Sequence, residues 1–144
     1  MPVSSRAPYR FGSVEDDGQT IYEVVGGEPF FADVVERFYA GVVTDPVLRP
    51  MYPVDLTDSK RNLTLFLVQY WGGPMLYNDE RGHPRLRMRH APFPIDEAAA
   101  EAWYRCMYAA VRGAVAEAEL DPAVEAKLLA YFDMAAAALV NRVV

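Results

Sequence analysis

The feature that most constrains this chain is a repeated switch between helical hydrophobic patterns and Gly or Pro breaks. From Thr20 onward, apolar residues recur three or four positions apart, which is typical of amphipathic helices. The clearest pattern covers residues 30–42, between Gly26-Gly27 and Asp45-Pro46. A proline disfavours the helical conformation at the residue before it, so Pro46 ends this helix. We find no convincing alternating strand pattern and no internal repeat, so the sequence predicts an all-α fold.

The same signals locate the other helices. A short helical piece can start at Pro46, and a longer helix begins near Thr57 or Asp58, either of which can cap it. Residues 75–84 show little periodicity, and an irregular stretch of that length in a compact domain is often functional. The later helices are expected from Pro84 to Pro92, after an Asp96 cap, and from Asp121-Pro122 onward.

The composition limits the classes of protein to which the chain can belong. Its 144 residues suit one domain, and its net charge of -6 opposes broad nucleic-acid binding. Cys106 is the only cysteine, which excludes an internal disulfide and indicates a cytoplasmic protein. No run of about 18 apolar residues occurs, so no membrane span is expected. Residues 1–18 are expected to be a flexible or loosely docked extension, followed by one domain at residues 19–144.

Two histidines are the candidate imidazole ligands. His90 lies four residues after Leu86, so both face the same side of the expected short helix. A neutral imidazole in an apolar setting is what a haem iron needs on its proximal side. The alternative is a histidine near a helix C-terminus that interacts with the helix dipole or with water. His83 directly precedes Pro84 and carries little weight as a ligand.

Tyr39, Tyr52 and Trp103 place hydrogen-bonding groups among apolar residues. For any one of them, ordinary core packing is a sufficient explanation, because buried phenols and indoles usually find a partner. Together they would supply three donors to a bound dioxygen, which takes negative charge from ferrous iron.

An arginine run surrounds the two histidines and has three interpretations. The run consists of Arg81, Arg85, Arg87 and Arg89. It could contact nucleic acid, form a solvated helix face, or pair with haem propionates, since guanidinium groups bind carboxylates well. The acidic net charge makes nucleic-acid contact the least favoured of the three.

Two longer motifs resemble one known family. The chain reads YWGGP at residues 70–74 and RGHPRLRMRHAPF at residues 81–93. This pattern closely resembles the truncated haemoglobins of the second group, especially those of actinobacteria, and the resemblance extends from about Ile21 to Asn141. It implies a two-over-two helical sandwich around haem b (iron protoporphyrin IX), with a reduced segment before His90 in place of a full helix.

The resemblance also implies roles for individual residues. His90 would be the proximal iron ligand, while Tyr39, Tyr52 and Trp103 would line the distal side. The other implied haem-pocket residues are Ser59, Leu63, Phe66, Leu67, Arg89, Phe93, Met107 and Met134.

Two positions depart from patterns found in other globins. Ser59 stands where many globins place a distal histidine, so the tyrosines and the tryptophan would hold the ligand. Asn62 stands where some relatives carry an arginine for a haem propionate. Arg61, or the arginines near His90, would have to replace it.

The implied activity is reversible dioxygen binding with high affinity and slow release. The alternative is a haem enzyme at the same site, with nitric-oxide dioxygenase or peroxidase-like activity. That alternative needs a separate reductase, because the chain shows no flavin or nicotinamide domain. A haem-free regulatory helical module is a third interpretation. Other diatomic ligands are expected at the same iron, and the paired aromatic residues leave a homodimer open.

Overall fold

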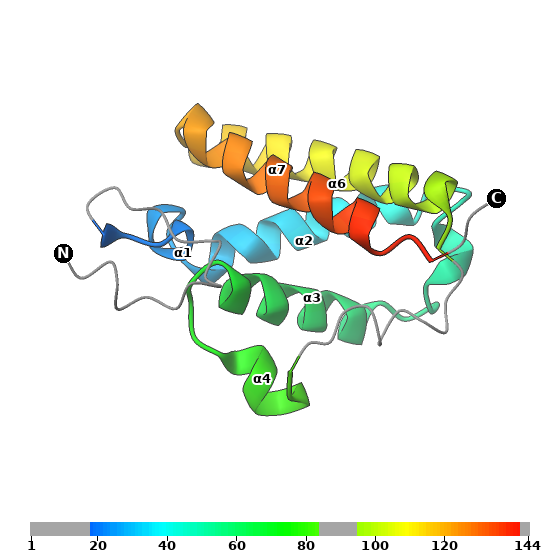
Figure 1. Cartoon of the computed structure of the whole chain (residues 1–144), viewed down its shortest axis with the longest axis horizontal. Coiled ribbons are helices and arrows are strands. Elements are labelled where there is room, and N and C mark those ends of the chain that lie inside the picture. The colour runs from blue at the N-terminus through cyan, green and yellow to red at the C-terminus, as the bar shows by residue number, and fades with distance from the viewer. Residues whose placement is uncertain (1–17, 84–94, 142–144) are drawn as a thin grey trace.

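The computed structural model describes residues 18–83 and 95–141. The long helices form two layers (Figure 1). One layer holds α2 (Glu28–Val42) and α3 (Thr57–Tyr70), and the other holds α6 (Glu97–Ala118) and α7 (Pro122–Ala138). The shorter elements are α1 (Ile21–Val24), η3 (Arg49–Met51) and α4 (Leu76–Arg81). The predicted all-α, two-over-two arrangement is therefore confirmed.

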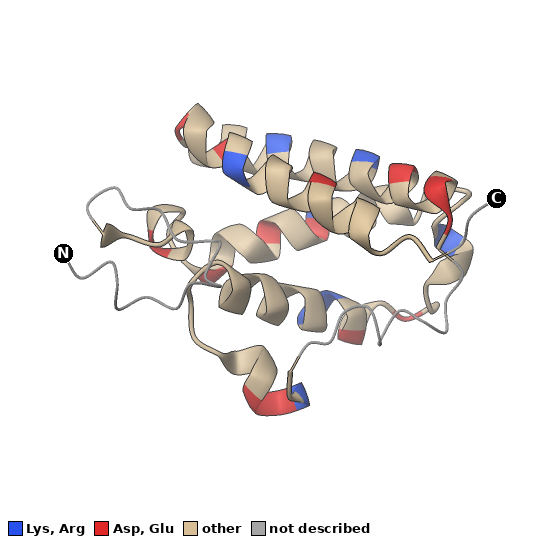
Figure 2. Cartoon of the chain, in the orientation of Figure 1, with Lys and Arg blue, Asp and Glu red and all other residues tan. Residues whose placement is uncertain are grey.

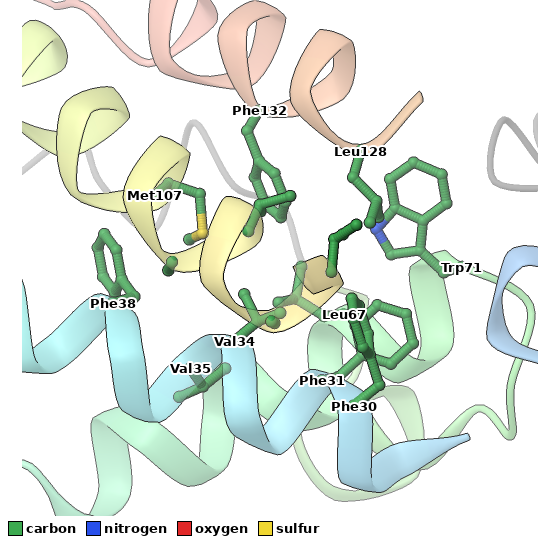
Figure 3. Packing of buried hydrophobic residues seen from close by; sticks show 14 of the residues in the cluster. Phe30, Phe31, Val34, Val35, Phe38, Leu67, Trp71, Met107, Leu128 and Phe132 are labelled. Carbon is green, nitrogen blue, oxygen red and sulfur yellow. The ribbon is translucent and has the colours of Figure 1, made fainter. Parts of the chain in front are cut away.

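The core lies between the two layers. This core contains Phe31 and Phe38 of α2, Met107 of α6 and Phe132 of α7, which Figure 3 shows among the labelled core side chains. These four side chains are almost completely buried. Removing apolar surface from water contributes about 25 cal/mol per Å² and is the main force that holds such layers together. The packing of α2 against α6 therefore fixes the frame on which the remaining elements sit.

Aspartate side chains accept backbone N–H groups where three of the long helices begin, and in α6 and α7 that aspartate is the N-cap residue. The Asp96 carboxylate accepts the Ala99 N–H at 2.8 Å, and the Asp121 carboxylate accepts the Ala123 N–H at 2.8 Å, as expected. The prediction that Thr57 or Asp58 caps α3 is wrong. Asp55 lies two residues before the first helical residue, and its carboxylate accepts the Thr57 N–H at 3.0 Å.

The stretch that lacks periodicity contains a helix, α4, which the sequence analysis missed. Six residues are too few to show a hydrophobic repeat, and tertiary contacts hold this helix instead. The Gln69 side chain accepts the Asn78 N–H at 2.9 Å and donates to the Asn78 side chain at 3.0 Å. A side chain of α3 therefore determines where α4 lies.

The YWGGP motif has a packing explanation. Gly72 has a φ of +106°, and a Cβ added there would lie 2.5 Å from the Thr20 Cβ. A Cβ on Gly73 would lie 2.7 Å from Tyr22 and Val68 side-chain atoms. The Tyr22 N–H donates to the Trp71 carbonyl at 2.9 Å. The two glycines thus let the α1 segment pack closely against the end of α3.

The charged surface, the predicted absence of a membrane span and the predicted N-terminal extension can be compared with the structure. In the view of Figure 2, basic and acidic residues are interspersed along α6 and α7. Within residues 18–83 and 95–141, no helix combines the length and the apolar character that a membrane crossing requires. The predicted extension at residues 1–18 lies outside the described residues except for Gly18.

Candidate functional site

A cavity of about 360 Å³ lies where η3, α3, α6 and α7 converge. This volume falls within the range of small-molecule sites, about 300–1,000 Å³. Most of the lining is hydrocarbon or aromatic. The predicted wall of Leu63, Phe66 and Leu67 on α3 lines this cavity, opposite Ala99 of α6 and residues of α7.

The structure brings Tyr39, Tyr52 and Trp103 together on the lining of this cavity. They come from α2, from the residue after η3, and from α6. The rings of Tyr39 and Tyr52 meet edge to face with centroids 5.5 Å apart. Phe38 also packs against Trp103, with centroids 5.5 Å apart. Three residues far apart in sequence thus form one contiguous polar edge.

Hydrogen bonds link these side chains in pairs. Burial raises the pKa of Tyr39 to about 12, and a hydrogen bond with the Ser59 side chain works in the opposite direction. Burial also raises the pKa of Tyr52, with smaller contributions in the same direction from Tyr39 and Cys106, while a hydrogen bond with Trp103 lowers it. An indole N–H can only donate, so Trp103 donates to the Tyr52 oxygen. We call Tyr39, Tyr52, Ser59 and Trp103 the Tyr39 cluster.

Ser59 and Asn62 both line the cavity from α3, as their positions in the sequence led us to expect. Arg61 does not face the same way. Its guanidinium pairs with the Glu80 carboxylate of α4, and the Arg61 side chain is more than half exposed. The arginine next to Asn62 is therefore already engaged with an acidic partner.

Met107 and Met134 are not brought to the cavity. Met107 is completely buried, and Figure 3 shows it among the core side chains near Phe38 and Phe132. Met134 is 56% exposed. Tyr131, Ala135 and Leu139 occupy the cavity side of α7, and Met134 lies beside that row and faces solvent. Neither methionine lines the described cavity, and their assignment to the haem pocket stays a prediction.

The predicted proximal ligand His90 and the predicted haem-pocket residues Arg89 and Phe93 lie outside the described residues. The two described flanks of that segment are His83, which is exposed, and Ile95, which is buried and lines the cavity. Ile95 is held by two hydrogen bonds to Asn141. The Ile95 N–H donates to the Asn141 side chain at 2.7 Å, and the Asn141 N–H donates to the Ile95 carbonyl at 2.8 Å.

Sequence reasoning missed two tyrosines that line the cavity, Tyr77 and Tyr131. Tyr77 lies on α4, where no periodicity was found. Tyr131 lies on α7, where the spacing of apolar residues places it on the inner face of the helix beside Leu128. The signal that could have distinguished Tyr131 was its phenol, because a polar group on an inner helix face needs either a partner or a cavity.

The lining suits one class of ligand. A flat, mainly apolar group with a polar reaction centre would find hydrocarbon on most sides and the Tyr39 cluster at one edge. Within the described residues, no set of three or more His, Cys, Asp or Glu side chains could hold a bare metal ion.

Comparison with known proteins identifies the class. The model of the bacterial-like globin family matches residues 20–138, and the chain therefore belongs to this family, which carries haem and binds oxygen. Its relatives include truncated haemoglobins of the second group. One such protein of Bacillus subtilis is 49% identical over 86 residues. That alignment spans 60% of this chain and 64% of the relative, which is less than two thirds of its length.

Solved structures show the same relationship over more of the chain. The thermostable haemoglobin of Thermobifida fusca has 48% identity and a TM-score of 0.80, over 85% of this chain and 98% of that one. A truncated haemoglobin of Bacillus subtilis, described as oxygen-avid, has 39% identity and a TM-score of 0.76, over 85% of this chain and 100% of that one.

Proposed function

We propose that this chain binds dioxygen reversibly at ferrous haem b, with high affinity and slow release. The observation that carries the proposal is the Tyr39 cluster, in which three aromatic side chains and one serine direct polar groups to the edge of a mainly apolar cavity. The oxygen-avid relative from Bacillus subtilis has the same fold.

In this proposal His90 holds the iron and the Tyr39 cluster holds the ligand. Ferrous haem supplies the iron that binds dioxygen. Because the Tyr52 oxygen accepts a hydrogen bond from Trp103, the Tyr52 O–H proton remains available for the ligand. Trp103 N–H becomes the second donor when it exchanges its bond to the Tyr52 oxygen for one to the bound ligand, and Tyr39, held by Ser59, supports the Tyr52 hydroxyl. Leu63, Phe66 and Leu67 exclude water from this edge.

These contacts account for slow release. A hydrogen bond to a charged acceptor contributes about 1.5–3 kcal/mol. Each 1.4 kcal/mol corresponds to a factor of ten, so one such bond would slow oxygen release by about tenfold to a hundredfold. Slow release suits chemistry on a bound ligand better than transport. An external reductase, a homodimer and a cytoplasmic location stay predictions of the sequence.

The haem propionates need basic partners in the same site. Since Arg61 is paired with Glu80, the arginines that precede His90 are the proposed partners of the haem propionates, Arg89 first among them. A guanidinium matches a carboxylate with two parallel hydrogen bonds.

Absorption spectra of the ferric, reduced and oxygenated protein test the proposal. The wild type is expected to show a globin-like Soret band and an oxy spectrum, and His90→Ala should weaken or alter both. His83→Ala is the matched control, because His83 is exposed and does not line the cavity, and its spectra should equal those of the wild type. A wild type that takes up no haem would refute the proposal.

A further inference from the structure

Three oxidisable rings lie in mutual contact beside the same cavity. The rings of Tyr70 and Tyr131 are the closest aromatic pair of the described residues, with centroids 4.2 Å apart and a 30° tilt. Trp71 contacts both, at 5.1 Å from Tyr70 and 5.5 Å from Tyr131. We call these three residues the Tyr70 cluster. Phenol and indole are the side chains that lose a single electron most readily after thiols, so their grouping is chemically significant.

The cluster connects the cavity with the protein surface. Tyr131 lines the cavity, Trp71 is 2% exposed, and Tyr70 keeps partial exposure without lining the cavity. Phe132 packs against Tyr131 and also against Trp103, with centroids at 5.2 Å and 6.0 Å. Electron tunnelling is fast between rings in contact. An electron can therefore pass from Tyr70 through Tyr131 to the cavity without crossing a gap in the packing.

The ability to lose a proton determines which of the three rings in the Tyr70 cluster can remain oxidised. A phenol must lose its proton when it loses an electron, and it therefore needs an acceptor. Trp71 Nε1 is buried and has no hydrogen-bond partner in the part of the chain that the structure describes, so its proton has no acceptor there. Tyr131 is the more buried of the two phenols, and burial raises its pKa above the ordinary value. Tyr70 is the ring from which a proton can reach solvent water.

We infer that the Tyr70 cluster is a one-electron donor to the haem when the protein meets hydrogen peroxide, an inference that rests on the proposed haem site. Cleavage of the O–O bond of one peroxide to two waters consumes two electrons and two protons. One electron comes from the haem, and the second leaves Tyr70, whose phenolic proton passes to solvent. A small phenol then returns a hydrogen atom to Tyr70, and a second phenol restores the haem. The balance is one peroxide and two phenols in, two waters and two phenoxyl radicals out.

Spin trapping locates the radical. The haem-loaded protein is mixed with hydrogen peroxide and a nitroso spin trap, and peptide mass spectrometry finds the trapped residue. The wild type is expected to carry the adduct on Tyr70. Tyr70→Phe should lose it, and Tyr131→Phe should reduce it, because each variant keeps a ring but removes one oxidisable phenol. Guaiacol, added as the reducing phenol, should suppress the adduct.

A second tyrosine pair provides the matched control. Tyr104 and Tyr108 lie on α6 with ring centroids 6.0 Å apart, and neither lines the cavity. Tyr104→Phe should leave the adduct on Tyr70 unchanged. An adduct on Tyr104, Tyr108 or the Tyr39 cluster, or an undiminished Tyr70 adduct in Tyr131→Phe or with guaiacol, would overturn the inference. A Soret band without any adduct overturns this inference alone, whereas an absent Soret band overturns the proposed function with it.

Discussion

The Tyr39 cluster and the Tyr70 cluster border one cavity, but they differ in how their polar atoms are hydrogen-bonded. In the Tyr39 cluster, Tyr39 is hydrogen-bonded with Ser59 and Tyr52 with Trp103. In the Tyr70 cluster, ring packing dominates, and Trp71 Nε1 is the buried side-chain polar atom without a partner in the described residues. Both contain two tyrosines and one tryptophan, so their aromatic composition does not distinguish them, and only the Tyr39 cluster adds a serine.

The difference teaches what each cluster can do. Buried polar groups are nearly always paired, and a buried N–H without a partner is costly. A hydrogen-bonded group such as the Tyr39 cluster holds fixed donors at the cavity edge, which favours recognition of a polar ligand. A cluster of rings in tilted and edge-to-face contact contributes packing and a path for electrons. Four predictions test whether the two clusters are separable in this way.

The largest expected effect concerns stability at the Tyr70 cluster. Trp71→Ala is expected to lower the free energy of unfolding by about 3–5 kcal/mol, the usual cost of truncating a buried aromatic residue. Trp71→Phe should cost clearly less, because it keeps a ring and removes an N–H that has no partner. Urea denaturation of the haem-loaded variants measures both. Equal losses in the two variants would mean that the indole N–H contributes a contact.

The second effect is a loss of stability at alkaline pH. The pKa of Tyr39 is raised to about 12, so the folded state keeps the proton that the unfolded state releases above about pH 10. Stability from this difference is fully present below pH 10 and is lost as the pH rises toward 12. Two pKa units correspond to about 2–3 kcal/mol, and Tyr39→Phe should remove most of that slope. Denaturation at pH 9 and pH 11.5 measures it.

Tyr70→Phe is the comparison for the alkaline experiment. Burial also raises the pKa of Tyr70 to about 12, but Tyr70 is partly exposed, and solvent screens its contribution. Its substitution should therefore flatten the slope less than Tyr39→Phe does. A larger effect from Tyr70 would contradict the assignment of Tyr39 as the more deeply buried phenol.

The third effect separates the two tryptophans by ligand release. Trp103→Phe removes a donor from the Tyr39 cluster and should speed oxygen dissociation by about tenfold to a hundredfold. Trp71→Phe should leave the dissociation rate unchanged, since Trp71 does not line the cavity. Stopped-flow measurement of oxygen dissociation from the oxygenated protein tests both expectations. An unchanged rate in Trp103→Phe would refute the role proposed for Trp103.

Much of the fold could be predicted from local signals. Apolar spacing identified α2, and carboxylates before helical runs identified the caps at Asp96 and Asp121. The same local reasoning failed where a distant contact decides the structure. α4 depends on Gln69, and the Thr57 N–H at the start of α3 donates to Asp55, which lies outside the expected helix.

The candidate site was predictable to a different degree. The sequence singled out Tyr39, Tyr52 and Trp103 because they carry polar groups in apolar surroundings. Only the family resemblance implied that the three side chains meet at one site. Periodicity alone places Met107 and Trp103 on one face of α6, but it does not tell which turn of that face meets the cavity. The packing of α2, α6 and α7 determines which turn of α6 lies next to the cavity. No local pattern in a single sequence encodes that position.

The smallest effect is expected at Ser59, the least bulky member of the Tyr39 cluster. Ser59→Ala removes one hydrogen bond to Tyr39, which is worth about 0.5–1.5 kcal/mol, so oxygen dissociation should speed up by roughly tenfold or less. Because this bond lowers the pKa of Tyr39, its loss should raise that pKa further, and the loss of stability between pH 9 and pH 11.5 should become larger. Thr64→Val is the control, since the Thr64 hydroxyl donates to the Lys60 carbonyl within the same helix and does not line the cavity. A faster dissociation without a change in the alkaline loss of stability would mean that Ser59 acts on the ligand directly. The effect of Ser59 would then be independent of Tyr39.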